Sequence, residues 1–297
     1  MATLVSRGVR EVFRREAIPM RMLWWFAAEG MLEWFALLRD ELAPHLGGRA
    51  DAEATLSAIA RSMLQRRYGL LRATFPHLPS EADEPRAVGL LMGALYRTAS
   101  APRGAWVFER SGGAPRGYAD HVRAERLALP IPIRARWEEL TAHLGDLLVA
   151  LTTLLPDSMD RARPVLGELC FAAGERFGRK FRRAFALPQC PESALELLRM
   201  SEYVFRVNPE HWGGASADGS AGYLEGTACP WYEGPGWTGA HCGIFGQFQS
   251  GIASVFGLRY HLTTTIPKHG GHTCRIDVKP LGLRRGIEGA PLSMVRS

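Results

Sequence analysis

The sequence predicts an α+β fold, in which a helical N-terminal region is followed by a small antiparallel sheet with a packed helix. Apolar residues recur three and four positions apart through the first two thirds of the 297 residues, and this spacing is the period of an α-helix. From about Ser201 onward the composition shifts to Gly, Thr, His, Trp and Cys, with short β-rich runs. We therefore expect a helical region over residues 1–198 and a separate α+β domain over residues 199–297.

The helices of the first region are predicted from apolar stripes, which cover residues 20–38, 56–71, 137–151, 160–186 and 191–200. Asp51 is placed to cap the second of these helices, and Pro156 is placed to end the third. Glycines and prolines predict breaks at 47–48, 76–85 and 103–116. The two prolines within 127–136 predict an extended connector.

Short strands and one helix are expected in the last hundred residues. The β-rich runs cover residues 203–207, 222–228, 259–266 and 274–278. Between the second and third runs, apolar spacing predicts a helix over 242–256, with Gly257 at its end. This order of strands around one helix predicts an antiparallel sheet with the helix on one face. Gly270-Gly271 suits a tight turn between the last two strands.

Charge and hydropathy exclude two classes of partner. The chain has 36 Lys and Arg against 30 Asp and Glu, but its arginines are interspersed with acids, which argues against a nucleic-acid interface. The densest basic run, residues 175–183, could form a local anion site. The apolar stretches 20–38 and 144–155 carry charges or are too short to span a membrane. Five cysteines at wide spacing, without a recognisable signal peptide, predict reduced thiols in the cytoplasm.

Two segments of the second region concentrate reactive side chains, namely 229–242 and 269–274. The first is rich in glycine and tryptophan. Glycine lets the backbone approach a ligand closely, and the indoles of Trp231 and Trp237 can supply apolar walls. This loop is the best pocket candidate in the sequence.

Cys242 is a candidate nucleophile because the first turn of a helix favours a thiolate. His241 is adjacent to it, but neighbouring helical residues do not face each other, so the base is expected from His269 or His272. In the alternative interpretation, Cys242 is a small buried residue and His241 is a polar cap. His269 and His272 would then belong to a solvated turn.

A zinc site is a second interpretation of the same residues. Cys229, Cys242 and Cys274, with His269 or His272, have the ligand types of a tetrahedral centre. No C-x-x-C pair accompanies them, so we expect no metal and treat zinc as the less favoured alternative.

Substrate-binding candidates are the charged residues Glu233, Arg259 and Arg275, because arginine can bind a carboxylate with two hydrogen bonds. They would suit a small substrate that carries a carboxylate and an amine. Arg259 and Arg275 could equally be ordinary surface charge.

The order of these residues carries a resemblance. A strand ending in Cys229-Pro-Trp is followed by Cys242 at the start of an apolar helix, then by TTTIPKHGGHTCRIDV, which contains a Gly-Gly turn and Cys274. This order resembles the L-2-amino-thiazoline-4-carboxylic acid hydrolase-like family, which is distantly similar to vinyl-reductase-type small-molecule-binding domains. The likeness covers roughly residues 200–280.

The resemblance implies hydrolysis of a cyclic amidine-like C–N bond in a thiazoline amino acid, with Cys229, Cys242 and Cys274 as candidate site residues. Such a reaction needs a group that activates water or attacks the carbon between N and S, and an acid for the leaving nitrogen. His241, His269 and His272 are added because they lie near those cysteines in the sequence.

We therefore expect a cytoplasmic, cofactor-independent, hydrolase-like enzyme that acts on a small heterocyclic or sulfur- and nitrogen-containing amino acid. Trp231 and Trp237 would also suit a larger, more apolar substrate, as in a biosynthetic relative with altered chemistry. The alternative is a non-catalytic small-molecule-binding or sensor module. A small molecule is the expected partner, without nucleic acid or membrane, and the helical region could join two copies into a homodimer.

Overall fold

The computed structural model describes residues 4–97, 105–110, 117–154, 162–205, 211–227, 229–232, 234–265 and 273–281. Ten helices lie in these ranges, together with a 3-10 turn at Ala43–His45. Their bounds are α1 Leu4–Arg14, α2 Met20–Leu42, α3 Arg49–Thr74, α4 Ala87–Leu95, α5 Ala105–Arg110, α6 Gly117–Ala128, α7 Ile133–Leu154, α8 Ala162–Phe185, α9 Pro191–Val204 and α10 Gly239–Ser254.

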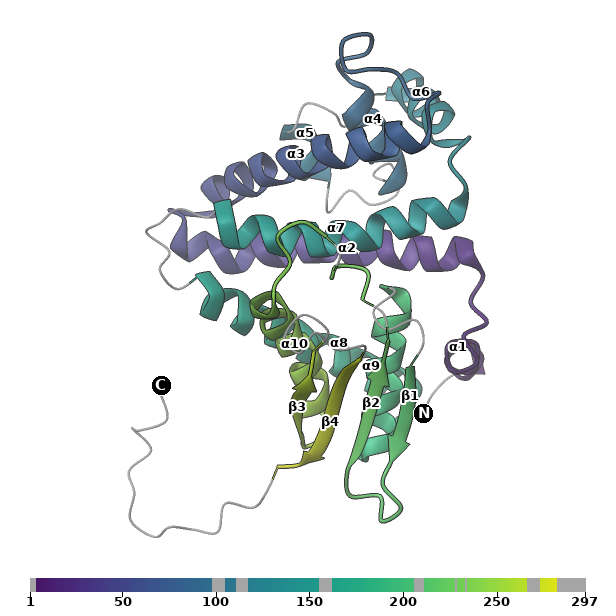
Figure 1. The fold of residues 1–297 in the computed structure, drawn as a ribbon, viewed down its shortest axis with the longest axis vertical. Helices are drawn as coiled ribbons and strands as arrows, with labels where there is room; N and C mark the ends of the chain where they lie inside the picture. The colour runs from purple at the N-terminus through teal and green to yellow at the C-terminus, as the bar shows by residue number, and fades with distance from the viewer. Residues whose placement is uncertain are drawn as a thin grey trace.

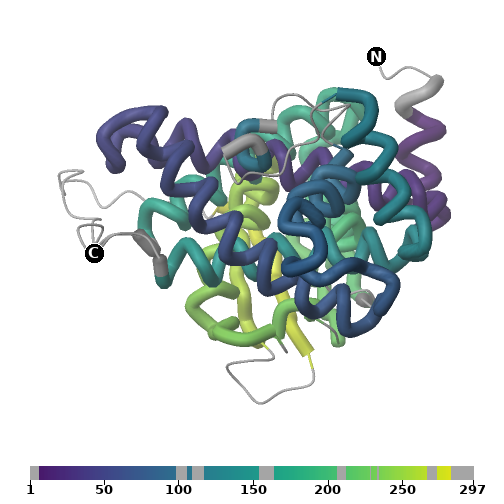
Figure 2. The backbone as a smooth tube through the Cα atoms, turned by 90° about the horizontal axis from the view of Figure 1, so that it is seen from above, coloured from purple at the N-terminus to yellow at the C-terminus, as the bar shows by residue number. Residues whose placement is uncertain are grey.

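The helices form layers above and behind one sheet. Helices α2 and α7 run side by side across the middle of the molecule, with α3 to α6 on one side of this pair and the sheet on the other (Figure 1). Seen from above, the first helices lie over the strands (Figure 2). None of the helices that the structure describes combines the length and apolar character needed to cross a membrane.

The strands are β1 His211–Ala215, β2 Gly222–Gly226, β3 Leu258–Thr264 and β4 Cys274–Pro280. They form an antiparallel sheet in the order β1-β2-β4-β3, with α10 and α9 on one face. Leu224, Ile276 and Val278 are buried on that face. The α+β prediction is confirmed, as is the pairing of the last two strands, although the predicted turn between them lies outside the described residues.

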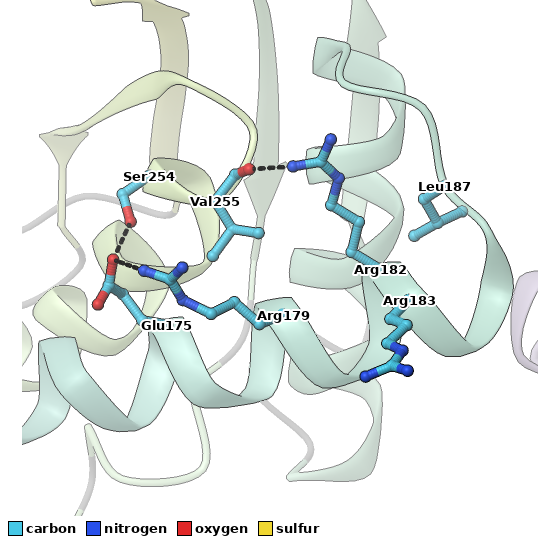
Figure 3. Close-up of a pocket in the computed structure, with 7 residues that line it drawn as sticks. All are labelled: Glu175, Arg179, Arg182, Arg183, Leu187, Ser254 and Val255. Atoms are coloured by element: carbon cyan, nitrogen blue, oxygen red, sulfur yellow. Dashed lines mark hydrogen bonds and ion pairs between the residues drawn. The ribbon is translucent and has the colours of Figure 1, made fainter.

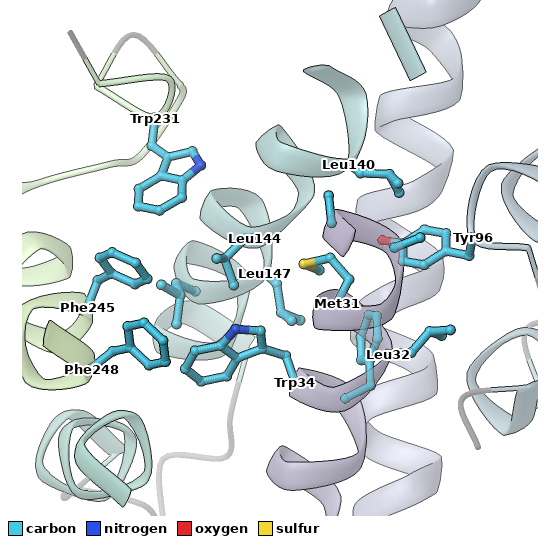
Figure 4. Close-up of a cluster of buried hydrophobic side chains, with 14 of the residues drawn as sticks. Met31, Leu32, Trp34, Tyr96, Leu140, Leu144, Leu147, Trp231, Phe245 and Phe248 are labelled. Carbon is cyan, nitrogen blue, oxygen red and sulfur yellow. The ribbon is translucent and has the colours of Figure 1, made fainter. Parts of the chain in front are cut away.

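Buried apolar side chains form one core that runs from α2 through α7 and α10 to the sheet. Figure 4 shows Leu144 and Leu147 of α7 in one cluster with Trp34 of α2 and Phe245 of α10. Helix α9 crosses the predicted boundary between residues 198 and 199. The division of the chain there stays a prediction, and the two regions share a core.

Helices α8 and α10 approach each other unusually closely, because glycines face the partner backbone on both. A Cβ atom on Gly174 would overlap the carbonyl oxygen of Phe248, and one on Gly251 would overlap that of Phe171. Side chains therefore cannot separate the helices at these positions. This contact fixes α10 against the helical region.

Some local predictions are wrong. Residues 203–204 belong to α9 rather than to a strand, and the Tyr203 hydroxyl donates to the carbonyl of Glu16 at 2.8 Å, so packing outweighs the β-propensity. The first strand is instead β1, in which two of five residues are glycine, so its composition carries only a weak β signal. Residues 206–207 lie outside the described residues.

Three predictions about where helices begin, end or are interrupted also differ from the structure. The predicted connector 127–136 is mostly helical, since α6 continues to Ala128 and α7 begins at Ile133. Helix α3 begins at Arg49 after Gly48, so Asp51 lies in its first turn and does not cap it. The short helix α5 lies within the predicted loop 103–116. Pro156 lies outside the described residues, whereas Gly257 adopts the expected left-handed φ of 71° after α10.

Candidate functional site

The loop before α10 is anchored on α7 by Trp231. Its indole N–H donates to the carbonyl of Thr141 at 2.7 Å, and its ring lies edge-on to Phe245 at 4.8 Å between centroids. The ring occupies the space beside Gly145, where a Cβ atom would overlap the indole. Trp231 is 3% exposed (Figure 4), so it holds the loop in place and is not an open wall of a pocket as the sequence predicted.

Trp237 continues this aromatic cluster toward the start of α10. Its ring lies 5.0 Å from that of Trp231 and 5.3 Å from that of His241. Its indole N–H donates to the Sγ of Cys242 at 3.3 Å. Trp237 therefore connects the anchored loop directly to a thiol.

His241 caps the helix rather than activating a neighbour. The Thr238 N–H donates to its Nδ1 at 3.0 Å, and the Thr238 side chain accepts from the N–H of His241, which makes a capping box. The Thr152 hydroxyl donates to the carbonyl of Val149, so its oxygen accepts from Nε2 of His241 at 2.9 Å. Both ring nitrogens are thus committed, and His241 is not a base for Cys242.

Three thiols from separate elements gather beside this cap. Cys229 follows β2, Cys242 lies in the first turn of α10, and Cys274 begins β4 opposite Gly226. The side chains of Cys242 and Cys274 are close enough to Cys229 to influence its ionisation. Each of the three is a free cysteine with partial solvent exposure. We call these three residues the thiol site.

Two of the three thiols, Cys229 and Cys242, are disfavoured as thiolates. Burial raises the pKa of Cys229 to about 12. Burial also raises the pKa of Cys242, although the hydrogen bond from Trp237 opposes the increase. The predicted effect of the helix N-terminus does not prevail at Cys242, and at neutral pH both side chains are neutral thiols.

A polar chain that the sequence reasoning missed lies under the thiol site. The Tyr260 hydroxyl donates to Oε1 of Gln249 at 2.6 Å, and Nε2 of Gln249 donates to Oε1 of Glu202 at 2.6 Å. Burial raises the pKa of Tyr260 well above its ordinary value, with smaller contributions from Glu202, Cys274 and Cys242 in that order. A polar residue on the apolar face of the predicted helix, Gln249, was the available signal.

The structure separates the predicted arginines from the thiols. Strand alternation turns Arg259 and Arg275 to the face opposite α10, whereas Cys274 and Tyr260 face α10. Arg275 lies 4.2 Å from the centroid of the Tyr223 ring, and its Nη2 is 3.2 Å from Oδ1 of Asp277. Arg259 and Arg275 are therefore unsuited to bind a substrate carboxylate at the thiol site.

The remaining candidates, Glu233, His269 and His272, lie outside the described residues, and their roles stay predictions. Within the described part of the chain, no three His, Cys, Asp or Glu side chains are grouped so that they could hold a metal ion. The zinc interpretation also uses His269 or His272, which lie outside the described residues, so the expectation about metal stays a prediction.

Comparisons with known proteins found no matching family model, no matching curated protein and no matching solved structure.

Proposed function

We propose that this chain binds a small heterocyclic molecule at the thiol site. The observation that carries the proposal is the convergence of Cys229, Cys242 and Cys274, three partly exposed free thiols from three separate elements, beside an anchored aromatic loop. Neutral thiols act as small, polarisable contacts for a ligand and remain weak donors. The loop and the capped helix hold them in place before a ligand arrives, which lowers the entropic cost of binding.

Binding fits the site better than thiolate catalysis does. A nucleophilic cysteine needs a lowered pKa or a base in reach. Burial raises the pKa of both Cys229 and Cys242, and His241 already uses both ring nitrogens. These observations support the binding-module interpretation over the hydrolase that the family resemblance implies.

Hydrolysis is the second candidate, and one contact favours it. The indole N–H of Trp237 donates to the Sγ of Cys242, and such a donor stabilises a thiolate. In this case water would add to the thiazoline carbon between N and S, the ring C–N bond would break, and the leaving nitrogen would take up a proton.

One titration tests both functions. L-2-Amino-thiazoline-4-carboxylate is added to the full chain, tryptophan fluorescence reports binding near Trp237, and mass spectrometry detects any product heavier by one water. A second titration uses 2-aminothiazoline, which lacks the carboxylate. We expect similar affinity for both compounds, because Arg259 and Arg275 face away from the thiols.

The variants are Cys242→Ala and, as a control, Cys190→Ser, which changes a partly exposed cysteine at the start of α9. A fluorescence change without product, weakened by Cys242→Ala alone, supports binding. If a product forms and Cys242→Ala abolishes it, the protein is a hydrolase and not a binding module. If neither compound gives a fluorescence change or a product, the proposed ligand class is wrong.

A further inference from the structure

A hollow of about 390 Å³ lies at the other end of α10, lined by arginines of α8. Arg182 and Arg183 follow Arg179 by three and four residues, so each lies about one turn along the helix from it. Leu187, Ser254 and Val255 complete its walls, together with Glu175 (Figure 3). A rise of 1.5 Å per residue places Ser254 about 18 Å from Cys242 along α10, so the hollow is separate from the thiol site.

Arg182 is held in position by three contacts. Its Nη1 donates to the carbonyl of Val255 at 2.7 Å, and its Nη2 donates to Oε1 of Gln189 at 3.4 Å. Its guanidinium also lies 5.5 Å from the centroid of the Phe256 ring. A guanidinium has five N–H donors, so a fixed Arg182 keeps donors for a ligand.

The other two arginines have little to hold them. Nη2 of Arg179 pairs with Oε1 of Glu175 at 3.0 Å, but its side chain is 68% exposed, and such exposed pairs contribute little to stability. Arg183 makes no hydrogen bond or ion pair within the described ranges, and its guanidinium extends away from Val255 (Figure 3). Both side chains are thus free to turn toward a ligand.

Two groups oppose an anion in the hollow. Glu175 carries the same charge as the ligand would, and the last carbonyls of α10 carry partial negative charge. Arg182 already donates a hydrogen bond to one of these carbonyls, that of Val255. The three arginines that line the hollow outnumber its one carboxylate, which leaves an excess of positive charge.

We infer that this hollow is a binding site for an oxyanion, namely the phosphate group of a small phosphorylated molecule. Arginine can bind two phosphate oxygens with one guanidinium, and a dianion attracts the excess positive charge. The side chains of Leu187 and Val255 would contact the apolar part of the molecule. Arg182 positions the phosphate, and Arg179 and Arg183 close over it.

Calorimetric titration of the full chain with inorganic phosphate and pyrophosphate at low salt tests the inference. We expect Arg179→Gln and Arg183→Gln each to weaken the affinity about tenfold, since a charged hydrogen bond is lost. Glu175→Gln is expected to strengthen the affinity about threefold, because it removes the competing carboxylate.

The matched control is Arg134→Gln on α7. Its side chain is 71% exposed and pairs with Glu138 at 3.0 Å, four residues away, much as Arg179 pairs with Glu175. We expect this variant to bind both anions like the unchanged protein. Absence of phosphate and pyrophosphate binding, an equal loss in Arg134→Gln, or weaker binding by Glu175→Gln would overturn the inference.

Vesicles of phosphatidylcholine with and without phosphatidic acid separate two sources of the phosphate group. Binding to soluble pyrophosphate that Arg183→Gln weakens, without sedimentation with the vesicles, assigns the site to a soluble phosphate ester. Sedimentation with phosphatidic acid vesicles assigns the site to a lipid headgroup, provided that Arg183→Gln reduces it and Arg134→Gln sediments like the unchanged chain.

Discussion

The ring nitrogens of Trp237 and His241 form hydrogen bonds to neighbouring residues, and these bonds determine the chemistry available at the thiol site. Trp237 donates to Cys242, whereas His241 bonds to Thr238 and Thr152. The imidazole therefore stabilises the start of α10, and the thiol beside it lacks that base. At the scale of residues, burial disfavours the thiolate of Cys229, whereas burial and the indole of Trp237 act in opposite directions on that of Cys242.

Thiol alkylation across pH tests this view. Because burial raises the pKa of Cys229 to about 12 and also raises that of Cys242, iodoacetamide should label both slowly at about pH 7 and much faster near about pH 10. Peptide mass spectrometry gives the rate at each cysteine. Cys170, which is fully buried, should stay unlabelled until the chain unfolds. Faster labelling of Cys242 than of a free cysteine near pH 7 would restore the nucleophile hypothesis.

A buried polar chain joins α3 and α7 to Tyr96, the residue after α4, and it makes the stability of the fold depend on pH in the acid range. Glu139 bonds to Arg67 and to Nε2 of His143, while Nδ1 of His143 contacts the Tyr96 hydroxyl at 2.6 Å. Although burial opposes ionisation, the hydrogen bonds from Arg67 and His143 lower the pKa of Glu139 to about 2. The carboxylate therefore stabilises the fold above its unfolded pKa.

Stability should accordingly fall as the pH drops from about 4.5 toward about 2, by about 3 kcal/mol from Glu139. Denaturant unfolding at a series of pH values measures this loss. Glu139→Gln should lower the free energy of unfolding at neutral pH, because it leaves Arg67 with only the longer contact to Asp146 at 3.8 Å, and should flatten the acid dependence. Glu138→Gln, at the adjacent, partly exposed position, is the control and should keep the full dependence.

At the scale of elements, α10 is the helix on which both proposed sites depend. It carries Cys242 in its first turn and Ser254 at its end, and α8 fixes it through the contact at Gly174 and Gly251. The strength of this helix pair therefore determines whether the sites keep their shape.

Gly251→Ala should destabilise the protein by several kcal/mol, because the new methyl group would overlap the carbonyl of Phe171 and force α8 and α10 apart. Gly243→Ala on the same helix has open space around it and should leave stability unchanged or raise it by up to about 1 kcal/mol. Thermal unfolding followed by circular dichroism compares the two. Equal effects would mean that the helices can separate without cost.

The sequence predicted helices with a clear apolar periodicity well. It predicted the ends of these helices, and the way the strands face, less well. The stripes of α8 and α9 and the spacing of Phe245, Phe248 and Ile252 placed those helices correctly, since the period reflects a buried face. Strand β1 and the direction of Arg275 could not be predicted, because glycine carries no β signal and the facing of a strand follows from its register. The cap at His241 was one of two interpretations that the sequence left open.

For the whole molecule, the shared core is the main feature. Apolar side chains from α2, α7, α10 and β4 belong to one cluster, and Trp231 joins the loop of the sheet region to α7. The change in composition near residue 199 could not reveal these contacts, because they join residues far apart in the chain.

We expect a single cooperative unfolding transition rather than separate ones for residues 1–198 and 199–297. Helical circular dichroism and tryptophan fluorescence should give coincident denaturant midpoints. A fragment of residues 199–297 should not fold alone, since it would expose the face of α10 that packs on α8. Two distinct midpoints, or a folded fragment, would show that the predicted domains are independent.

The close backbone contact between α8 and α10, at Gly174 and Gly251, also limits which substitutions this chain can accept during evolution. Substitution at Gly174 or Gly251 requires a shift of a whole helix, whereas Gly243 can drift freely. Descendants of this gene should therefore keep the first two glycines even where both ligand preferences have changed.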